Sequence, residues 1–292
     1  MPETYHISIG TDVGRSGWSA VRQVAERLLV WLAPCISTDV LIHSGEAECY
    51  ALWLLWENLM YRYLILIAAL CLAGTVSAQM PDTVFLEQLT WDEVRDSIAA
   101  GKTTVIVPTG GTEQNGPHMA LGKHNVRVAF TADAIARRLG NVLVAPVMAY
   151  VPEGSIEPPS GHMRFAGTIS LPDPVFRQVL ESTARSLKQH GFRDIVFIGD
   201  SGPNQPGQNA VAAALNAEWA SSNVRVHAVP GYYRSDPEGD AAEMMKFGIR
   251  KDEIGNHADV RDTSQMMAVD PKMVRNAKLQ AGDGKNGIQG DP

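Results

Sequence analysis

Cysteine is scarce in this chain of 292 residues, and most of the chain contains none. The three cysteines are Cys35, Cys49 and Cys71, and all of them precede Gln79. The part of the chain after Gln79 therefore has neither a disulfide framework nor a thiolate for catalysis. A chain without cysteine suits an oxidising compartment such as the periplasm.

An excess of positive charge is missing as well. The formal net charge is -7 at pH 7, which gives no reason to expect a nucleic acid or an anionic membrane as a partner. The contents of 45% hydrophobic and 20% charged residues are those of an ordinary soluble globular protein. A length of 292 residues allows one large domain or two small ones. The composition therefore favours a folded protein that acts on a small or neutral substrate.

Long hydrophobic runs are also lacking. The apolar run over 64–73 is too short for a comfortable membrane span. It comes after a basic residue, Arg62, and leads to small residues, with the sequence VSA at 76–78. This combination is typical of a secretory signal peptide. We therefore expect residues 60–78 to be a signal peptide cleaved after Ala78, and the mature protein to be periplasmic or secreted without a stable membrane anchor. The alternative is an uncleaved N-terminal anchor.

The segment before this signal, residues 1–59, shows no clear continuity with the rest of the chain. It includes an apolar patch rich in tryptophan, ALWLLW, at 51–56. We interpret Met60 as the true start of the protein and residues 1–59 as an over-extended reading frame. A small extra domain is the alternative.

Beyond Gln79, apolar strands alternate with helical segments. Strands that are apolar throughout and separated by helices are typical of a mostly parallel sheet covered on both faces. Internal repeats and low-complexity tracts are absent. The sequence therefore predicts a single α/β domain over 80–292, with three α/β/α layers and a mostly parallel sheet. The expected strands are 103–108, 142–147, 194–199 and 224–229, and the expected helices are 91–100, 126–139, 174–189 and 208–220.

Side chains that can bind a metal or take part in catalysis are concentrated in the loop after the first expected strand. Residues 110–118 read GGTEQNGPH, and His124 comes soon after. Loops at the carboxyl ends of parallel strands are where open α/β sheets place their active sites. A carboxylate and imidazoles in such a loop can meet at a Zn²⁺ or Mn²⁺ ion. Glu113 is the first candidate ligand, and His118 and His124 are the next.

Two later loops carry further candidates. The loop over 151–168 contains His162, and a loop of this length in a compact domain is usually functional. The loop over 199–205 contains Asp200 and Ser201, but neither the Gly-x-Gly-x-x-Gly of a nucleotide site nor the Gly-x-Ser-x-Gly of a serine hydrolase. We therefore interpret Asp200 as a candidate metal ligand or base.

The loop over 255–264 offers a pair for proton transfer. His257 can act as a proton shuttle, with Asp259 as the carboxylate that orients it. Asp262 either joins this chemistry or caps the next helix, and we favour the cap.

Together these loops resemble the creatininase family of metal-dependent amidohydrolases over 84–292. The first loop resembles the family's Glu-Gln-His-Gly-Pro-His signature, and residues 165–170 (FAGTIS) resemble its Phe-Pro-Gly-Thr-Ile-Ser segment. Residues 199–204 lie where the family has Asn-Gly-His-Gly-Gly-Asn, and residues 257–264 resemble its His-Ala-Gly-Glu-x-Glu-Thr-Ser. The resemblance implies a creatininase-like α/β fold and a homo-oligomer. Since residues 286–292 resemble the segment before the family's last helix, we expect that helix to be missing.

The resemblance also implies two divalent metals bridged by a carboxylate, which activate a water for attack on an amide. Glu113 matches a ligand of the family. Asn115 stands where the family has a ligand His, and His124 where it has the bridging Asp. Ser201 replaces another ligand His, and Pro203 a ligand Glu.

These departures argue against a pair of metals. One imidazole nitrogen cannot readily hold two cations at short range, and two cations with a single matching carboxylate would repel each other. We therefore expect one divalent ion, Zn²⁺ or Mn²⁺, on Glu113 and His124, with Asp200 or His118 as a third ligand and an open position for catalysis.

The expected function is hydrolysis of a C–N bond in a cyclic or linear amide, a small-molecule substrate, by metal-activated water. One alternative is a small-molecule binding protein on the same fold that has lost catalysis, which the replaced ligands favour. Another is a metal-free lyase or isomerase that uses His257 and Asp200. The expected catalytic residues are His257, Asp259 and Asp200, and the expected substrate contacts are His118, His162, Asn115 and Ser201.

Overall fold

The computed structural model describes residues 55–63, 81–233, 237–251 and 253–289. The chain forms two compact units, Met1–Ala78 and Gln79–Pro292. In the first unit, residues 55–63 are helical and exposed. Most of the expected signal peptide, with its cleavage site after Ala78, lies outside the described residues, as does most of the segment before it. Among the described helices, none is both long and apolar enough to cross a membrane.

The second unit is built on a parallel sheet of four strands in the order β2-β1-β3-β4. The central strands pair along their full length, with Val105 opposite Ile195 and Val107 opposite Phe197. On the other side of β1, Val105 lies opposite Leu143. Side chains alternate between the two faces, and both faces are apolar, as a sheet covered on both sides requires. The strands are β1 (Thr104–Thr109), β2 (Val142–Val144), β3 (Asp194–Gly199) and β4 (Arg225–Ala228).

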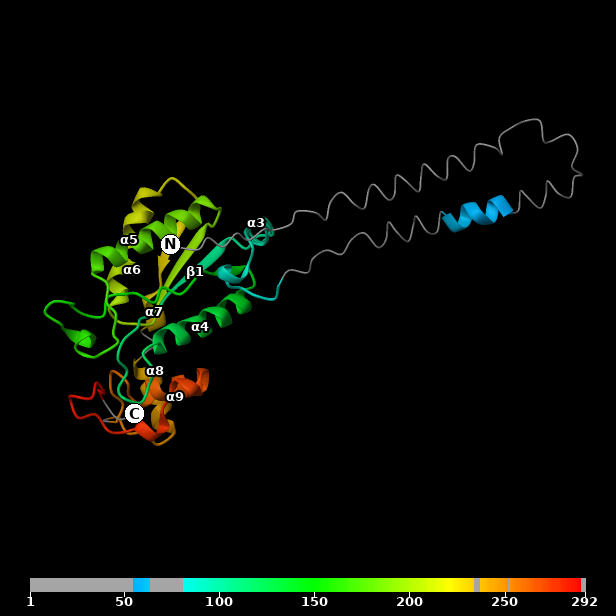
Figure 1. The fold of residues 1–292 in the computed structure, drawn as a ribbon. Coiled ribbons are helices and arrows are strands. Elements are labelled where there is room, and N and C mark those ends of the chain that lie inside the picture. The colour runs from blue at the N-terminus through cyan, green and yellow to red at the C-terminus, as the bar shows by residue number, and fades with distance from the viewer. Residues whose placement is uncertain (1–54, 64–80, 234–236, 252, 290–292) are drawn as a thin grey trace, which may run out of the picture. The chain divides into compact units, whose positions relative to one another are not determined.

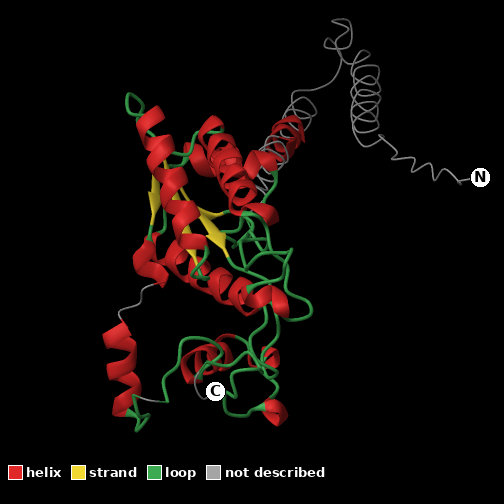
Figure 2. Cartoon of the chain, turned by 90° about the vertical axis from the view of Figure 1, so that its left-hand side faces the viewer, coloured by secondary structure: helices red, strands yellow, loops and turns green. Residues whose placement is uncertain are grey.

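Helices cover both faces of this sheet (Figures 1 and 2). One core joins Val105 and Val107 to the apolar sides of α5 and α6, with α3 at its margin. The core on the other face joins Ile106 to α4, with a contribution from Tyr232 of α7. The expected three-layer α/β/α architecture is therefore confirmed. The helices are α3 (Trp91–Ala99), α4 (Lys123–Leu139), α5 (Asp173–Gln189), α6 (Asn204–Glu218) and α7 (Pro230–Tyr233).

The C-terminal segment has a small core of its own. Met119, from the loop after β1, packs there with Ala258, Met266 and Ile288. An antiparallel bridge between Met119 and Val274 ties this segment to the same loop. The loop after β1 therefore reaches from the sheet into the C-terminal segment. The remaining elements are η3 (Leu86–Gln88), η4 (Gly161–Arg164), α8 (Pro237–Lys246), α9 (Val260–Val269), η5 (Pro271–Met273) and η6 (Asn276–Lys278).

Two boundaries differ from expectation in ways that affect the site. Helix α4 begins at Lys123 rather than at residue 126, so His124 lies in the first turn of a helix and not in a loop. The N-cap of α9 is Asp259, whose side chain accepts a hydrogen bond from the backbone N–H of Asp262. The expected cap role of Asp262 is therefore wrong, because its carboxylate is engaged by other partners.

Candidate active site

A cavity of about 670 Å³ lies where the loops after the strands meet the C-terminal segment. Glu113 enters it from the loop after β1, Asp200 from the loop after β3, and Tyr232 from α7 after β4. His257 and Asp262 line it from the C-terminal segment. The position agrees with the rule that open α/β sheets place their sites at the carboxyl ends of the strands.

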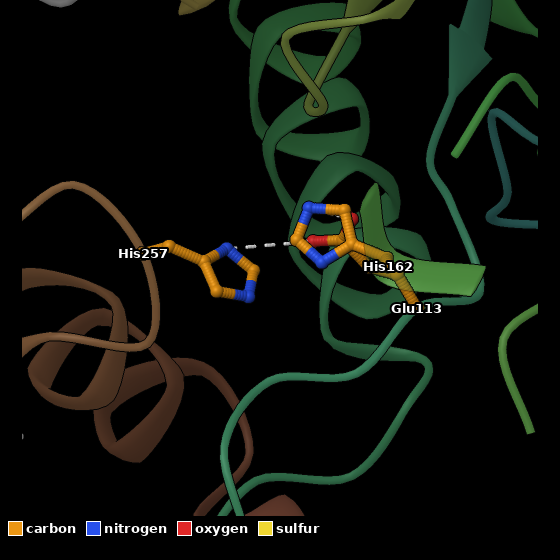
Figure 3. A group of neighbouring side chains, drawn as sticks. All are labelled: Glu113, His162 and His257. Atoms are coloured by element: carbon orange, nitrogen blue, oxygen red, sulfur yellow. Dashed lines mark ion pairs between the residues drawn. The ribbon is translucent and has the colours of Figure 1, made fainter. Parts of the chain in front are cut away.

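Glu113, His162 and His257 converge inside this cavity (Figure 3). One potential ligand atom from each residue lies within 4.8 Å of the other two. His162 Nε2 is 3.1 Å from Glu113 Oε2, and His257 Nδ1 is 3.7 Å from Glu113 Oε1. Glu113 Oε2 is buried without a hydrogen-bond partner. The cluster therefore directs two imidazoles and a partly unsatisfied carboxylate at one position.

A second carboxyl group, that of Glu153, is buried beside Glu113. Its exposed fraction is 1%, and both of its oxygens lack a hydrogen-bond partner. Gly111 leaves room for this carboxyl group, because a Cβ there would lie 2.3 Å from Glu153 Oε1. Burial, together with the adjacent negative charge of Glu113, raises the pKa of Glu153 to about 10. Glu153 is therefore a neutral acid at pH 7 that lies against an ionised carboxylate.

His124 is held between two carboxylates by both of its ring nitrogens. Nε2 lies 2.7 Å from Glu113 Oε1, and Nδ1 lies 2.6 Å from Asp200 Oδ1. Ionised carboxylates only accept hydrogen bonds, so each can accept one from the ring nitrogen that faces it. Burial opposes the ionisation of Glu113, but the hydrogen bond and charge of His124 outweigh it, and the pKa of Glu113 falls well below its ordinary value.

Two further cations of α4 complete a buried ionic network. Arg127 Nε donates to both oxygens of Asp200 at 2.8 and 3.0 Å, and its Nη1 donates to Asp262 Oδ1 at 2.8 Å. Lys123 Nζ donates to Asp262 Oδ2 at 2.7 Å. Tyr232 adds a hydroxyl donor to Asp200 Oδ2 at 2.7 Å. Despite their burial, these positive charges and hydrogen bonds lower the pKa of both Asp200 and Asp262.

The expected metal ligands and substrate contacts are only partly brought together. Glu113, His124 and Asp200 are neighbours, but His124 uses both nitrogens on the two carboxylates. Their joint role as metal ligands therefore stays a prediction, and the cluster that leaves ligand atoms free combines Glu113 with His162 and His257.

The other expected site residues divide between the cavity and its surroundings. Ser201 and His162 line the cavity. Asn115 is fully buried and donates to the backbone oxygens of Glu113 and Ala120. His118 is fully buried with its Nε2 2.9 Å from the hydroxyl of Thr263. Asp259, paired in expectation with His257, serves as the N-cap of α9.

Several residues of the site were not anticipated from the sequence. Glu153 belongs to the Gly- and Pro-rich loop that the sequence predicts to be functional. An acidic residue beside Gly154 in such a loop is a signal that could have identified it as a site residue. Lys123 and Arg127 are four residues apart, a spacing that places two side chains on one face of a helix. Gln114, between the ligand candidates, contacts both His162 and His257.

The chain is similar to known proteins over most of its second unit. A sequence model of the creatininase family, described as creatinine amidohydrolase, matches residues 87–290. Creatinine amidohydrolase of Pseudomonas putida is 31% identical over 204 residues, which cover 67% of this chain and 75% of that protein. A mycofactocin precursor peptide peptidase of Mycobacterium ulcerans is 27% identical over 188 residues, covering 62% of this chain and 64% of that protein.

Solved structures agree with the sequence matches. A crystal structure of creatininase superimposes with a TM-score of 0.57 at 25% identity, covering 69% of this chain and 78% of that chain. A creatininase variant described as Zn–Zn type superimposes with a TM-score of 0.55 at 26% identity and the same coverage. The expectation of a hydrolase that acts on C–N bonds is thus confirmed at the level of the family: residues 87–290 make this chain a divergent member of the creatininase family.

Proposed function

We propose that this protein is a metal-dependent amidohydrolase that cleaves a C–N bond in a small cyclic or linear amide. The observation that carries the proposal is the convergence of Glu113, His162 and His257 in a cavity at the carboxyl ends of the strands. The cavity volume of about 670 Å³ is within the range of small-molecule sites. Membership of the creatininase family, whose matched relatives are an amidohydrolase and a peptidase, supports the same reaction class.

The donor set fits a divalent cation. Glu113, His162 and His257 place a carboxylate oxygen and imidazole nitrogens within 4.8 Å of one another, and a carboxylate with at least one of these imidazoles suits Zn²⁺ and Mn²⁺. Glu113 Oε2 is a buried acceptor without a partner, as expected for an atom that ligates a cation. When bound, the ion would lower the pKa of a water and polarise the amide carbonyl. Relatives include a structure described as creatininase Mn, in addition to the Zn–Zn type.

The ionic network argues for one ion rather than two. Asp200 and Asp262 are the remaining ionised carboxylates described in the cavity lining, and His124, Arg127 and Lys123 already bind them. A second divalent ion would have to displace these cations from their partners. The positive charge that another metal would bring to the site is here carried by side chains of α4.

The chain's own residues also provide for proton transfer. Glu153 holds a proton on its carboxyl group at neutral pH because its pKa is raised to about 10. It is buried against Glu113 and is not among the residues that line the cavity. A neutral carboxylic acid in that place can supply a proton through Glu113 rather than directly to the departing nitrogen of an amide.

The metal content and activity of the purified full chain test this proposal. We expect about one Zn²⁺ or Mn²⁺ per chain, and hydrolysis of some members of a panel of cyclic and linear amides that includes creatinine and short peptides. Glu113→Gln should lose both the ion and the activity, because it removes the carboxylate shared by the whole cluster. Asp133→Asn is the matched control, since Asp133 lies in the same helix as His124 but pairs with Arg137 outside the cavity.

Two results would contradict the proposal. One is a wild-type protein that takes up neither ion when each is added in excess. The other is a Glu113→Gln variant that retains metal and turnover. A protein that binds small amides without hydrolysing them would instead support the alternative of a binding protein, for which Pro203, a cavity residue without a ligand atom in its side chain, is the favouring observation.

A further inference from the structure

Gln114 lies between the two histidines of the cluster in a fixed orientation. Its Nε2 is 3.0 Å from His162 Nδ1, 3.0 Å from His257 Nε2 and 3.2 Å from the backbone oxygen of Gly287. Its Oε1 accepts a hydrogen bond from the backbone N–H of Gly116 at 3.0 Å. A reversed amide would place Oε1 against the oxygen of Gly287 and the amide hydrogens against the N–H of Gly116. The nitrogen therefore faces the histidines.

The surroundings of His257 decide where its hydrogen lies. His257 Nε2 is 2.9 Å from the backbone oxygen of Gln114, which can only accept a hydrogen bond. The hydrogen of this imidazole is therefore on Nε2. Nδ1 is left with its lone pair, 3.7 Å from Glu113 Oε1.

The amide hydrogens of Gln114 then decide the state of His162. Gln114 has two of them, and with His257 Nε2 acting as a donor, the acceptors that remain are the oxygen of Gly287 and His162 Nδ1. This assignment gives both amide hydrogens of Gln114 and the N–H of His257 an acceptor. Because Nδ1 of His162 accepts, the hydrogen of the neutral ring lies on Nε2, 3.1 Å from Glu113 Oε2. That nitrogen then has no lone pair for a cation.

We propose that Gln114 is a positioning residue that gives the two histidines different roles: His257 offers Nδ1 as a ligand, and His162 offers the N–H of Nε2 as a hydrogen-bond donor. Gln114 therefore disfavours His162 as a ligand, since ligation through Nε2 would move its hydrogen to Nδ1, against the amide hydrogens. Glu113 and His257 are the principal protein ligands, and His162 donates to an oxygen or nitrogen of the substrate. The ligand role rests on the proposed function, whereas the hydrogen positions are a property of the metal-free protein.

Nitrogen-15 NMR of histidine side chains in the metal-free full chain tests the hydrogen positions directly. His162→Gln and His257→Gln assign the two signals. We expect both rings to carry hydrogen on Nε2 in the wild type, with Nδ1 of His162 shifted as a hydrogen-bond acceptor. In Gln114→Glu the added carboxylate accepts rather than donates, so the hydrogen of His162 should move to Nδ1 while that of His257 stays on Nε2.

Cation titrations test the consequence for binding. In the wild type we expect His257→Gln to weaken Zn²⁺ affinity by about tenfold or more and His162→Gln to change it by less than about threefold. In the Gln114→Glu background His162→Gln should also cost about tenfold, because His162 can now ligate. Comparing the two backgrounds cancels the general effect of the added negative charge. Gln114→Met removes the donor without adding charge. In this background too, His162→Gln should lower the Zn²⁺ affinity.

Two outcomes would overturn the inference: equal losses from His162→Gln and His257→Gln in the wild type, or a His162 hydrogen that stays on Nε2 in Gln114→Glu. If the wild type and every variant bind no cation, the proposed function fails. The NMR measurement still decides the hydrogen positions in that case, so the two failures are distinguishable.

Discussion

At the scale of single residues, His257 is an imidazole that the fold keeps neutral. Burial is the main cause, reinforced by the positive charge of Lys123, and the pKa falls from the ordinary 6.5 to about 4. The unfolded chain therefore binds a proton at a higher pH than the folded chain does. The contribution of neutral His257 to stability should be complete above pH 6.5 and should be lost as the pH falls from there toward 4.

This pH dependence is measurable by urea unfolding of the metal-free full chain, monitored by circular dichroism at a series of pH values. His257 alone can contribute up to roughly 3 kcal/mol across the window. His162 and His118, whose pKa values are also lowered by burial, act in the same direction. Glu153, whose pKa is raised to about 10 by burial beside Glu113, acts in the opposite direction. We therefore expect His257→Gln to reduce the slope of stability against pH in this window without abolishing it. An identical slope in the two proteins would contradict the prediction that folding lowers the pKa of His257.

At the scale of elements, a buried ionic network joins α4 to α9. Lys123 is fully buried in the first turn of α4, and its ammonium is bound by Asp262 in the first turn of α9. Asp262 also binds Arg127 and accepts from the backbone N–H of Ala258. Removing one partner of a buried pair leaves an uncompensated charge, and this is usually far more costly than losing an exposed pair.

We expect Asp262→Asn to lower the free energy of unfolding by about 3–5 kcal/mol, since it leaves Lys123 without its carboxylate. Lys123→Met should cost less, because Asp262 keeps Arg127. Asp133→Asn breaks an exposed pair within α4 and should cost no more than about 1 kcal/mol. Denaturant unfolding at pH 7 compares the three variants. Equal small losses in all of them would mean that the network does not join the two helices energetically.

The elements also show what the sequence could and could not predict. Strands β1 and β3 were found to within a residue because Val105–Val107 and Ile195–Ile198 are apolar runs, and such runs are a direct signal of a buried strand. The start of α4 was missed because Lys123 and His124 are polar residues buried by ionic partners distant in sequence. Strand β2 is shorter than expected, because Pro146 has no N–H to extend the ladder. Apolar periodicity reports burial by hydrophobic packing and does not report burial by charge pairing.

The candidate site, like the fold, was predictable from the sequence only in part. The loops that form it were identified from Glu113, Asp200 and His257, since each comes after a strand or before a helix. Which side chains meet was not predictable, because the contact of His124 with Glu113 depends on a helix start and that of His162 on the path of a long loop. Glu153 was not predicted as a site residue, because its neighbour Glu113 is forty residues away in the chain.

At the scale of the whole molecule, the chain separates into two compact units at Ala78 and Gln79. The boundary coincides with the cleavage site expected for the signal peptide, and all site residues belong to the second unit. We propose that the functional protein is the exported second unit, and that it forms a homo-oligomer.

Deleting residues 1–78 should therefore leave the thermal midpoint and Zn²⁺ affinity of the second unit unchanged. Expression of the full gene in a Gram-negative host should yield a periplasmic form whose intact mass corresponds to a start at Gln79. A truncated protein that fails to fold, or a full-length mass in the cytoplasmic fraction alone, would contradict this assignment. Sedimentation of the same material reports the oligomeric state.

The small core around Met119, Ala258, Met266 and Ile288 is separate from the two cores that cover the sheet. Local unfolding of such a unit requires less free energy than global unfolding. If this core opens alone, it carries His257 away from Glu113 while the sheet keeps Glu113 in place. A cation held by both residues would bind only the closed form and would favour closure by mass action. The ion would then link the C-terminal segment to the sheet. Its loss would allow this segment to unfold locally at a lower free energy than the rest of the protein.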